Sequence, residues 1–420
     1  MIYTFYSFKG GVGRSMAMAN VAEILYRKGL KVLLIDFDLE APGLERYFNS
    51  SEANYSSAEI LGKKGLIDLL IFSKELQNTP RISSPFQMPN GSAQSKKLFP
   101  FPITPLKNYC LSIYKNQAND GELLLIPAGR RTGKSFTDYA EKIQSFDWGD
   151  FYTNWYGEEF FEWFRQESEA IADVVLIDSR TGVTEMGGIC THQLADVVVM
   201  FVASNQQNLE GTLKIAQSLS NPDLIDKGRE GRKLHILAIP SRIENNEADS
   251  LDDFAKQFKG SLEKFVPLIL REGIQDSLFN ELKIPYIPYY AYQERVAVRE
   301  VVRESAADSI EAFEKLTTTL AKLAPADNRF HSFFLDSSVA FDVDQVKRIL
   351  LLAANPIDKS QIQFDEEVRE VIDGLHRSDH RDKFDLRFKF ASRPRDVQRA
   401  MLQEEPNIVH FSGHGEGEDG

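Results

Sequence analysis

Six short apolar runs, separated by longer segments with helical spacing, constrain the fold of this chain most strongly. The runs cover residues 2–8, 31–37, 122–128, 173–179, 197–203 and 234–240. Such continuous apolar runs are typical of strands that are buried on both faces of a parallel sheet. Helix candidates lie between them, at 14–28, 137–145, 157–170, 208–220 and 250–269. The alternation predicts a doubly wound α/β domain with a mostly parallel sheet over residues 1–325.

Length, charge and cysteine content narrow the class of protein. A chain of 420 residues is longer than one ordinary hydrophobic core accommodates, so two domains are expected. A net charge of −13 argues against binding nucleic acid by bulk electrostatics. Cys110 and Cys190 form no CxxC pair, so neither a disulfide framework nor a cysteine-ligated metal cluster is expected. The sequence contains no signal peptide and no membrane-spanning run, which favours the cytoplasm.

A glycine-rich turn joins the first predicted strand to the first helix, in FYSFKGGVGRSMAMANVA, residues 5–22. Glycines permit positive φ angles and let a ligand approach the backbone closely. Successive N–H groups at the start of the following helix would then form an anion-binding nest. The turn therefore predicts a nucleotide phosphate site. Its predicted residues are Gly10, Gly11, Val12, Gly13, Arg14, Ser15 and Met16.

This turn, KGGVGRS, resembles the deviant Walker A loop, KGGxGK[ST], of the MinD/ParA (SIMIBI) family of P-loop ATPases. The resemblance implies binding of ATP and Mg²⁺, with two subunits enclosing two nucleotides face to face. Lys9 matches the family's additional lysine, which reaches the partner's phosphates, and it is a candidate catalytic residue. Ser15 would offer its hydroxyl to Mg²⁺.

Two acidic segments extend the resemblance. The second strand, in VLLIDFDLEAPGL, is similar to the family's DxD segment, by which Asp36 would hold the Mg²⁺ hydration shell and Asp38 would orient the attacking water. DVVLIDSRTG resembles the Walker B strand and switch segment, which places Asp178 near Mg²⁺ and makes Gly182 part of a γ-phosphate sensor. Acidic residues at the ends of strands suit both roles. An acidic turn that caps a strand is the alternative for the DxD segment.

Further candidate residues lie in the switch segment and at the ends of later strands. Arg180, in the switch segment, is either a second phosphate contact or a solvated surface charge, and we favour the second interpretation. By their positions at strand ends, several residues are candidates for the base pocket: Arg242 and Pro288, with Ser241 and Tyr289.

A second Walker A-like sequence, AGRRTGKS at 128–135, contains the lysine that the first loop lacks, Lys134. We favour the first loop, because the DxD and DSRTG segments follow it in the family's order. The second loop is then expected to be a basic surface segment, which could lie at a subunit interface or supply cations to a partner.

Arg14 stands where the family has lysine. It keeps the charge but is longer and planar, so its position relative to the γ-phosphate must shift. Because phosphoryl transfer depends on placement and charge, a displacement near one ångström can lower the rate about 10²-fold. We expect a slow ATPase that uses ATP as a dimerisation switch. A nucleotide-binding scaffold without turnover is the alternative.

The remaining segments are of three kinds. Residues 75–120, rich in Pro, Ser, Asn and Gln, predict a long surface insertion that is either a loop without function or a lid or partner-binding element. Residues 326–346 predict a linker. Residues 347–420 predict a small second α/β unit.

This second unit resembles the opening half of a CHAT domain, a caspase-like module. The resemblance rests on a strand ending in AANP, a helix with Asp365, Glu366 and Glu367, and the segment HFSGHG. It implies that His414 is the catalytic base. No cysteine follows His414, so the unit is expected to be cut short and peptide hydrolysis by this chain is not expected.

Together the two resemblances imply a regulatory ATPase whose ATP-dependent homodimer controls an attached effector or partner protein, as in bacterial conflict and antiviral systems. A positioning or partitioning ATPase is the alternative. An iron–sulfur relative is disfavoured, because paired cysteines are lacking.

Overall fold

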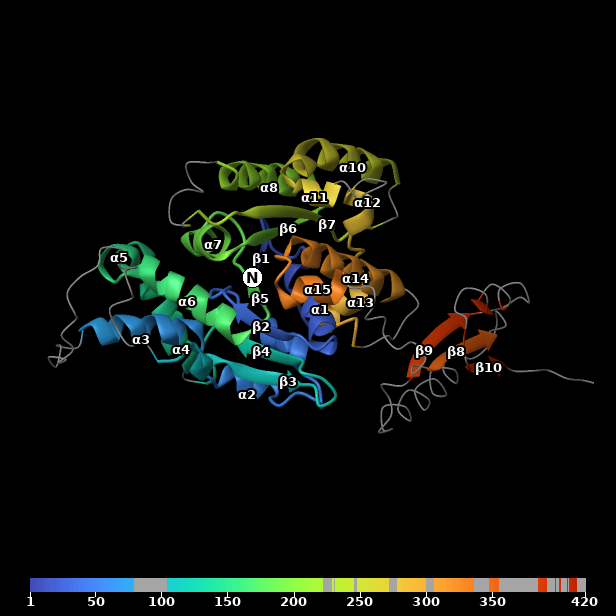
Figure 1. Cartoon of the computed structure of the whole chain (residues 1–420), viewed down its shortest axis with the longest axis horizontal. Helices are drawn as coiled ribbons and strands as arrows, with labels where there is room; N and C mark the ends of the chain where they lie inside the picture. The colour runs from blue at the N-terminus through green and yellow to red at the C-terminus, as the bar shows by residue number, and fades with distance from the viewer. Residues whose placement is uncertain are drawn as a thin grey trace, which may run out of the picture. The chain divides into compact units, whose positions relative to one another are not determined.

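The computed structural model describes ten longer stretches of the chain and five further residues. The stretches are 1–78, 104–133, 135–221, 231–244, 248–271, 278–299, 306–335, 347–354, 384–390 and 408–413, and the further residues are 229, 397, 400, 401 and 406. The described residues up to Leu335 form one compact unit, and those from Lys347 onward form a second. Each unit is described by itself (Figure 1).

Seven strands form the sheet of the first unit. They are β1 (Ile2–Ser7), β2 (Lys31–Asp36), β3 (Leu111–Lys115), β4 (Glu122–Ile126), β5 (Val174–Asp178), β6 (Val197–Ala203) and β7 (His235–Ser241). Their order is β3-β4-β2-β5-β1-β6-β7, and every neighbouring pair is parallel except β3–β4. The six apolar runs are the six parallel strands, so the prediction of an α/β fold with a mostly parallel sheet is confirmed.

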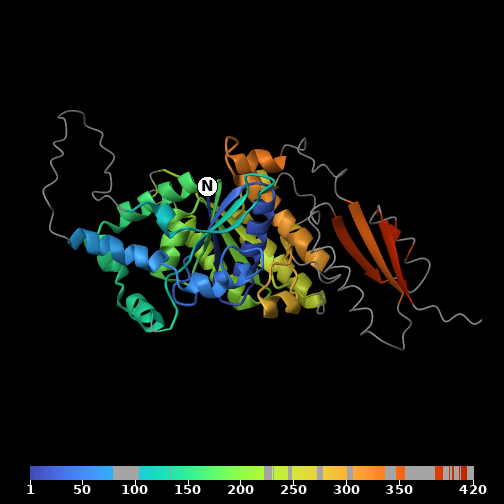
Figure 2. The same cartoon turned by 90° about the horizontal axis from the view of Figure 1, so that it is seen from below.

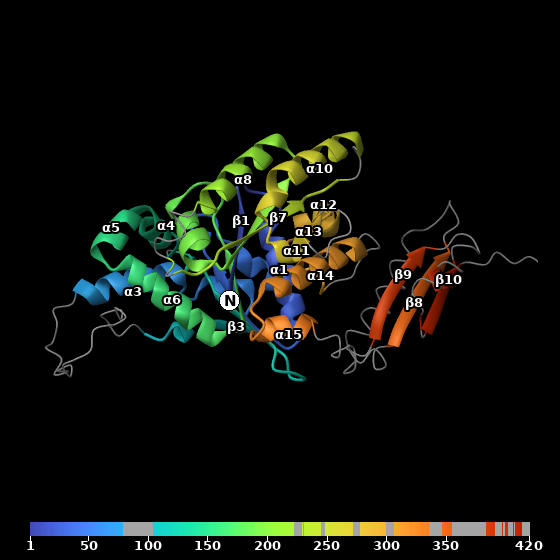
Figure 3. The ribbon, with the colours of Figure 1, turned by 45° about the horizontal axis from the view of Figure 1, so that its top comes forward.

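Helices cover both faces of this sheet (Figure 2). Alternate residues of β1 and β2 belong to two different core clusters, because successive side chains of a strand point to opposite faces. One cluster contains the apolar stripes of α1 (Arg14–Arg27) and α14 (Ala306–Leu323), and the other those of α3 (Leu66–Asn78) and α6 (Gly157–Ile171). A third cluster joins β6 and β7 to α8 (Gln206–Leu219) and α10 (Ala248–Leu262) (Figure 3).

Shorter helices complete the first unit. They are η1 (Leu44–Phe48), α2 (Ser57–Leu61), η2 (Leu106–Tyr109), α4 (Ser135–Ser145), α5 (Trp148–Asn154), α7 (Glu185–Gly188), the π-helix η3 (Ile189–Leu194), η4 (Glu263–Phe265), α11 (Leu268–Arg271), α12 (Leu278–Leu282), α13 (Pro288–Gln293) and α15 (Arg329–Leu335). Within the described part of the chain, no helix has the length and apolar character needed to cross a bilayer.

Two predicted boundaries differ from the structure. The predicted insertion, 75–120, overlaps the end of α3 and contains β3, an edge strand that pairs with β4. Its central residues, 79–103, lie outside the described residues. The predicted linker, 326–346, contains α15, and Phe330 of this helix is buried with its ring 5.8 Å from that of Tyr3. Residues 329–335 therefore belong to the first unit.

The second unit contains a three-stranded parallel sheet. Its order is β10 (Ile408–Gly413), β8 (Lys347–Ala354) and β9 (Phe384–Phe390). Leu350 and Leu352 of the central strand are buried together with Ala400. β8 includes the first residues of the AANP segment, where the sequence predicts a strand. The predicted helix with Asp365, Glu366 and Glu367 and the candidate base His414 lie outside the described residues.

Candidate functional site

Three segments meet at the edge of the sheet where β1, β2 and β5 end. β5 lies between the other two strands, and Asp178 is in register with Phe5 on one side and with Asp36 on the other. Because the strands are parallel, their carboxyl ends share one edge. The structure thus brings the glycine-rich turn, Asp36 and Asp178 together.

The turn has the backbone geometry of an anion-binding loop at two of its glycines. Gly11 and Gly13 have φ angles of 74° and 82°, in the region that side chains strain. Gly13 is the N-cap of α1 and supplies no side-chain acceptor, so the N–H groups of the first turn are left for another partner. Gly10 does not have a positive φ angle, so Gly11 and Gly13 are the two glycines of the turn that use this conformational freedom.

Arg14 joins the two acidic segments. Its Nε donates to Oδ1 of Asp178 at 2.5 Å, and its Nη2 donates to Oδ2 of Asp38 at 3.2 Å. The residue is only 7% exposed, and among the described residues its buried Nη1 has no acceptor. Leaving such a donor unmet costs about 1–3 kcal/mol, so a ligand oxygen at this position would be bound favourably.

Neighbouring carboxylates stabilise the charged form of Arg14. Burial by itself disfavours the charged form, but the carboxylates of Asp178 and Asp38 outweigh it, and the pKa of Arg14 is raised above its ordinary value. The pKa of Asp38 is also raised, because burial outweighs the stabilising effect of Arg14. The guanidinium therefore remains charged at every physiological pH.

Ser15 and Asp178 supply oxygen atoms suited to Mg²⁺. Ser15 Oγ donates to Oδ2 of Asp178 at 2.5 Å, while Oδ1 accepts from Arg14. Mg²⁺ prefers a few hard oxygen ligands from the protein, completed by water and substrate phosphates. The hydroxyl and carboxylate fit this requirement.

Asp36 organises the loop that follows β2, residues 37–43, which we call the Asp38 loop. It is 1% exposed and accepts hydrogen bonds from the backbone N–H groups of Asp38, Gly43 and Leu44, at 3.3–3.4 Å. Burial and then the charges of Asp178 and Glu45 raise its pKa well above the ordinary value. This role as an acceptor for the loop backbone was not anticipated from the DxD motif.

Arg131 also holds the Asp38 loop, through hydrogen bonds at its end. Its Nη2 donates to Glu45 Oε2 at 2.9 Å and its Nη1 to the carbonyl of Pro42 at 3.1 Å. Arg131 belongs to the second Walker A-like sequence. In that sequence Gly129 is packed so closely that an added Cβ would lie 2.5 Å from Ile67 of α3. The described part of this sequence therefore supports the Asp38 loop, and Lys134 lies outside the described residues.

Lys9 and the switch segment flank the turn. Lys9 is exposed and its Nζ donates to Gln207, near the start of α8. Gly182, with a φ angle of 78°, donates its N–H to Ser7 O at 3.2 Å. Arg180 forms a partly exposed ion pair with Glu40, which ties the switch segment to the Asp38 loop.

Arg242 contacts the turn from β7. Its Nη1 donates to the carbonyl of Gly11 at 2.7 Å, and its guanidinium lies 4.3 Å from the centre of the Tyr286 ring. An isolated bridge between Ile243 and Pro285 brings the segment before α13 to the end of β7, and Pro288 begins that helix. Tyr286 was not predicted, because no motif marks it.

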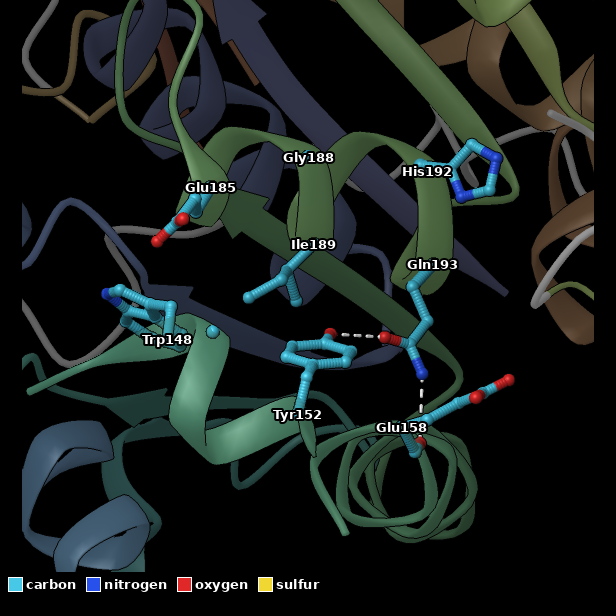
Figure 4. Close-up of a pocket in the computed structure, with 9 residues that line it drawn as sticks. Trp148, Tyr152, Glu158, Glu185, Gly188, Ile189, His192 and Gln193 are labelled. Atoms are coloured by element: carbon cyan, nitrogen blue, oxygen red, sulfur yellow. Dashed lines mark hydrogen bonds between the residues drawn. The ribbon is translucent and has the colours of Figure 1, made fainter. Parts of the chain in front are cut away.

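A separate pocket of about 550 Å³ lies beside the switch segment (Figure 4). Its walls include Trp148 and Tyr152 of α5 and Gln193 of the π-helix, and Tyr152 donates to Gln193 at 2.5 Å. Glu158 and Glu185 also line it, and no lysine or arginine does. Such a lining disfavours phosphate.

Comparison with protein families assigns the first unit. Residues 3–325 match the model of the CobQ/CobB/MinD/ParA nucleotide binding domain. The chain belongs to this family. The predicted MinD/ParA relationship is thereby confirmed. The resemblance of the second unit to a CHAT domain stays a prediction.

Solved structures similar to this MinD/ParA-type chain have low sequence identity. MinD from Aquifex aeolicus is 17% identical, with a TM-score of 0.42, and the match covers 75% of this chain and 96% of that one. A ParA family ATPase from Chlorobium tepidum is 18% identical, with a TM-score of 0.44 and coverage of 75% and 98%. MinD from Pyrococcus horikoshii, solved with Mg-ADP, is 16% identical, with a TM-score of 0.43 and coverage of 77% and 98%. Comparison with curated proteins gave no match.

Proposed function

We propose that the first unit binds ATP with Mg²⁺, hydrolyses it slowly and uses it as a homodimerisation switch. The observation that carries this proposal is the position of Arg14. One cation at the start of α1 contacts both the strand-end Asp178 and the Asp38 loop. The three parts needed for phosphoryl transfer, which are a phosphate turn, a metal-binding carboxylate and a water-orienting carboxylate, are thus within contact of one side chain.

Each residue has a role in this proposal. The N–H groups of the glycine-rich turn and of the first residues of α1 bind the phosphates. Arg242 stabilises the glycine-rich turn by donating a hydrogen bond to Gly11 O. Ser15 and Asp178 hold Mg²⁺, which neutralises charge on the phosphates when it is bound. Asp38 orients the attacking water. Asp36 keeps the Asp38 loop in place through its backbone hydrogen bonds.

The arrangement also supports slow turnover. Arg14 is engaged with two carboxylates, so it must exchange these contacts for phosphate oxygens before it can stabilise the transferring group. Breaking charged contacts that are largely buried is costly. Hydrolysis should therefore be slower than with a free lysine at the same place.

One exposed side chain supports dimerisation at the nucleotide edge. Lys9 is exposed in the turn, at the position of the additional lysine that the resemblance assigns to the partner's phosphates. In the proposed dimer, Lys9 exchanges Gln207 for a phosphate of the partner's nucleotide.

The second unit is proposed to be the effector that the switch controls. The parallel order of β10, β8 and β9 supports a small α/β unit, and His414 is its proposed base. The alternative, a positioning or partitioning ATPase, is favoured by the family to which the first unit belongs. A pelleting assay with DNA and with liposomes, with and without ATP, separates the two, because only the alternative requires ATP-dependent binding to one of these surfaces.

The central proposal is tested by nucleotide binding and mass. Calorimetry with Mg²⁺ should show binding of ATP, and light scattering should show a dimer with ATP and a monomer with ADP. Lys9→Ala should still bind ATP but remain monomeric. Lys256→Ala is the matched control, since Lys256 is an exposed lysine of α10 that pairs only locally with Asp253. A monomer with every nucleotide would contradict the proposed dimerisation switch. The absence of any nucleotide binding would contradict the proposal as a whole.

A further inference from the structure

We propose that, in the nucleotide-free chain, Arg14 takes the place of the divalent ion, so that the metal enters only with or after the triphosphate. The proposal concerns the regulation of the site described above and rests on its proposed function. It assigns to the arginine a second role that a lysine at this position would fill less completely, because the planar guanidinium carries five N–H donors in a rigid fork that can span two carboxylates, whereas an ammonium is a compact point charge.

The contacts of Asp178 carry the first step. Its Oδ1 accepts from Arg14 at 2.5 Å and its Oδ2 accepts from Ser15 at 2.5 Å. The same hydroxyl and carboxylate are the proposed metal ligands. An ion approaching Asp178 would therefore meet two oxygens that are already engaged, and it could bind only after the guanidinium had moved.

Charge gives the second step. Arg14 and Asp178 are 7% and 3% exposed, so water screens charges at this position weakly. A divalent ion on Asp178 would lie within a few ångströms of the guanidinium, and like charges in such an environment repel strongly. The metal and the arginine therefore compete for one carboxylate, and occupation by one lowers the affinity for the other.

The ligand supply gives the third step. Among the described residues, no group of three or more His, Cys, Asp or Glu side chains could hold a metal ion. Mg²⁺ at such a site needs phosphate oxygens to complete its ligands. A triphosphate would supply them and would also supply acceptors for Nη1 of Arg14, which has none among the described residues. Arginine binds phosphate through two N–H groups, so the triphosphate can draw it away from Asp178.

The test measures binding of Mn²⁺ alone, by electron paramagnetic resonance, to the whole chain without nucleotide. Wild type should bind weakly. Arg14→Gln should bind at least about tenfold more tightly, which corresponds to about 1.4 kcal/mol, because Asp178 and Asp38 are released. Arg180→Gln is the matched control, since it also removes an arginine charge paired with a nearby carboxylate, Glu40, but leaves Asp178 untouched. It should bind Mn²⁺ within about threefold of wild type.

Two results would overturn the inference. These are Mn²⁺ binding to Arg14→Gln no tighter than to wild type, or an equal gain in Arg180→Gln. Thermal melting checks that each variant is folded. If Arg14→Gln does not fold, the wild-type chain still decides, because Mn²⁺ should bind at least about tenfold more tightly with ATP present than without it. A separate titration with fluorescent ATP in chelator tests nucleotide binding itself, so failure of the proposed function is distinguished from failure of this inference.

Discussion

Arg131 donates to Glu45 at 2.9 Å, and both side chains are almost completely buried, at 7% and 3% exposure. This ion pair links the loop after β4 to the loop that carries Asp38. Pro42, in the same loop, accepts a second hydrogen bond from Arg131, and Tyr139 donates to Leu39 O at 2.5 Å. The position of the proposed water-orienting carboxylate thus depends on residues of a distant segment.

Loss of one member of this pair should destabilise the first unit. Arg131→Ala leaves the Glu45 carboxylate buried and unpaired, so the free energy of unfolding should fall by about 3–5 kcal/mol. Urea unfolding followed by tryptophan fluorescence measures it, because Trp148, Trp155 and Trp163 all belong to this unit. Arg180→Ala, which breaks the more exposed pair with Glu40, should cost less than about 1 kcal/mol. Equal losses in both variants would contradict this account.

Asp36 should make the first unit less stable as pH rises. Its pKa is raised in the folded chain by burial and by neighbouring carboxylates, so the folded state binds more protons than the unfolded state between the two pKa values. Stability contributed by this group is therefore present below the unfolded pKa and is lost as pH rises through the folded pKa. Asp36→Asn keeps an acceptor for the loop N–H groups and removes this loss. Its stability relative to wild type should increase between acidic and neutral pH, and a constant difference would show that Asp36 does not titrate in this way.

Restoring the family's lysine should speed hydrolysis. Arg14→Lys replaces a guanidinium held by two carboxylates with a compact ammonium that can lie between the phosphates. The kcat for ATP should rise by about 10–10²-fold, while ATP affinity changes less than about threefold. Single-turnover phosphate release measures the chemical step. An unchanged rate with intact ATP binding would mean that the position of this cation does not limit turnover.

The glycines of the turn offer a matched pair of substitutions. Gly13→Ala forces a side chain into a φ angle of 82° and should cost about 1–2 kcal/mol of stability and weaken ATP binding. Gly10→Ala should cost little, since Gly10 lacks a positive φ angle and an added Cβ meets no atom within 4 Å. Thermal melts and ATP titrations compare the two variants. Equal damage at both positions would argue against conformational strain as the cause.

The strands could be predicted from sequence because each buried parallel strand is a continuous apolar run, as in Lys31–Asp36. β3 was missed for a physical reason. It is an edge strand with a half-exposed face, its LSIYK sequence contains only a short alternation, and it follows a Pro-rich segment. Edge strands bury less surface, so their sequences carry less of the pattern that marks a strand.

The candidate site was predictable only in part. Motif spacing predicted which residues end strands, and the sheet order then placed Asp36 and Asp178 together. The contacts that fix their orientation depend on tertiary packing. Arg14 reaches Asp178 across 164 residues, and Arg131 reaches Glu45 across 86. No local pattern encodes such pairs, so the support that Arg131 gives to the Asp38 loop became visible only in the fold.

The docking of α15 on β1 has a mechanical consequence. Phe330 packs on Tyr3 near the start of β1, whereas the phosphate turn follows the end of the same strand, so the last helix of the first unit is clamped far from the nucleotide edge. The last described helix of the first unit is therefore held at the end of β1 opposite the turn. In the proposed dimer, a change in the turn would reach α15 only along the length of β1, through Tyr3 and Phe330.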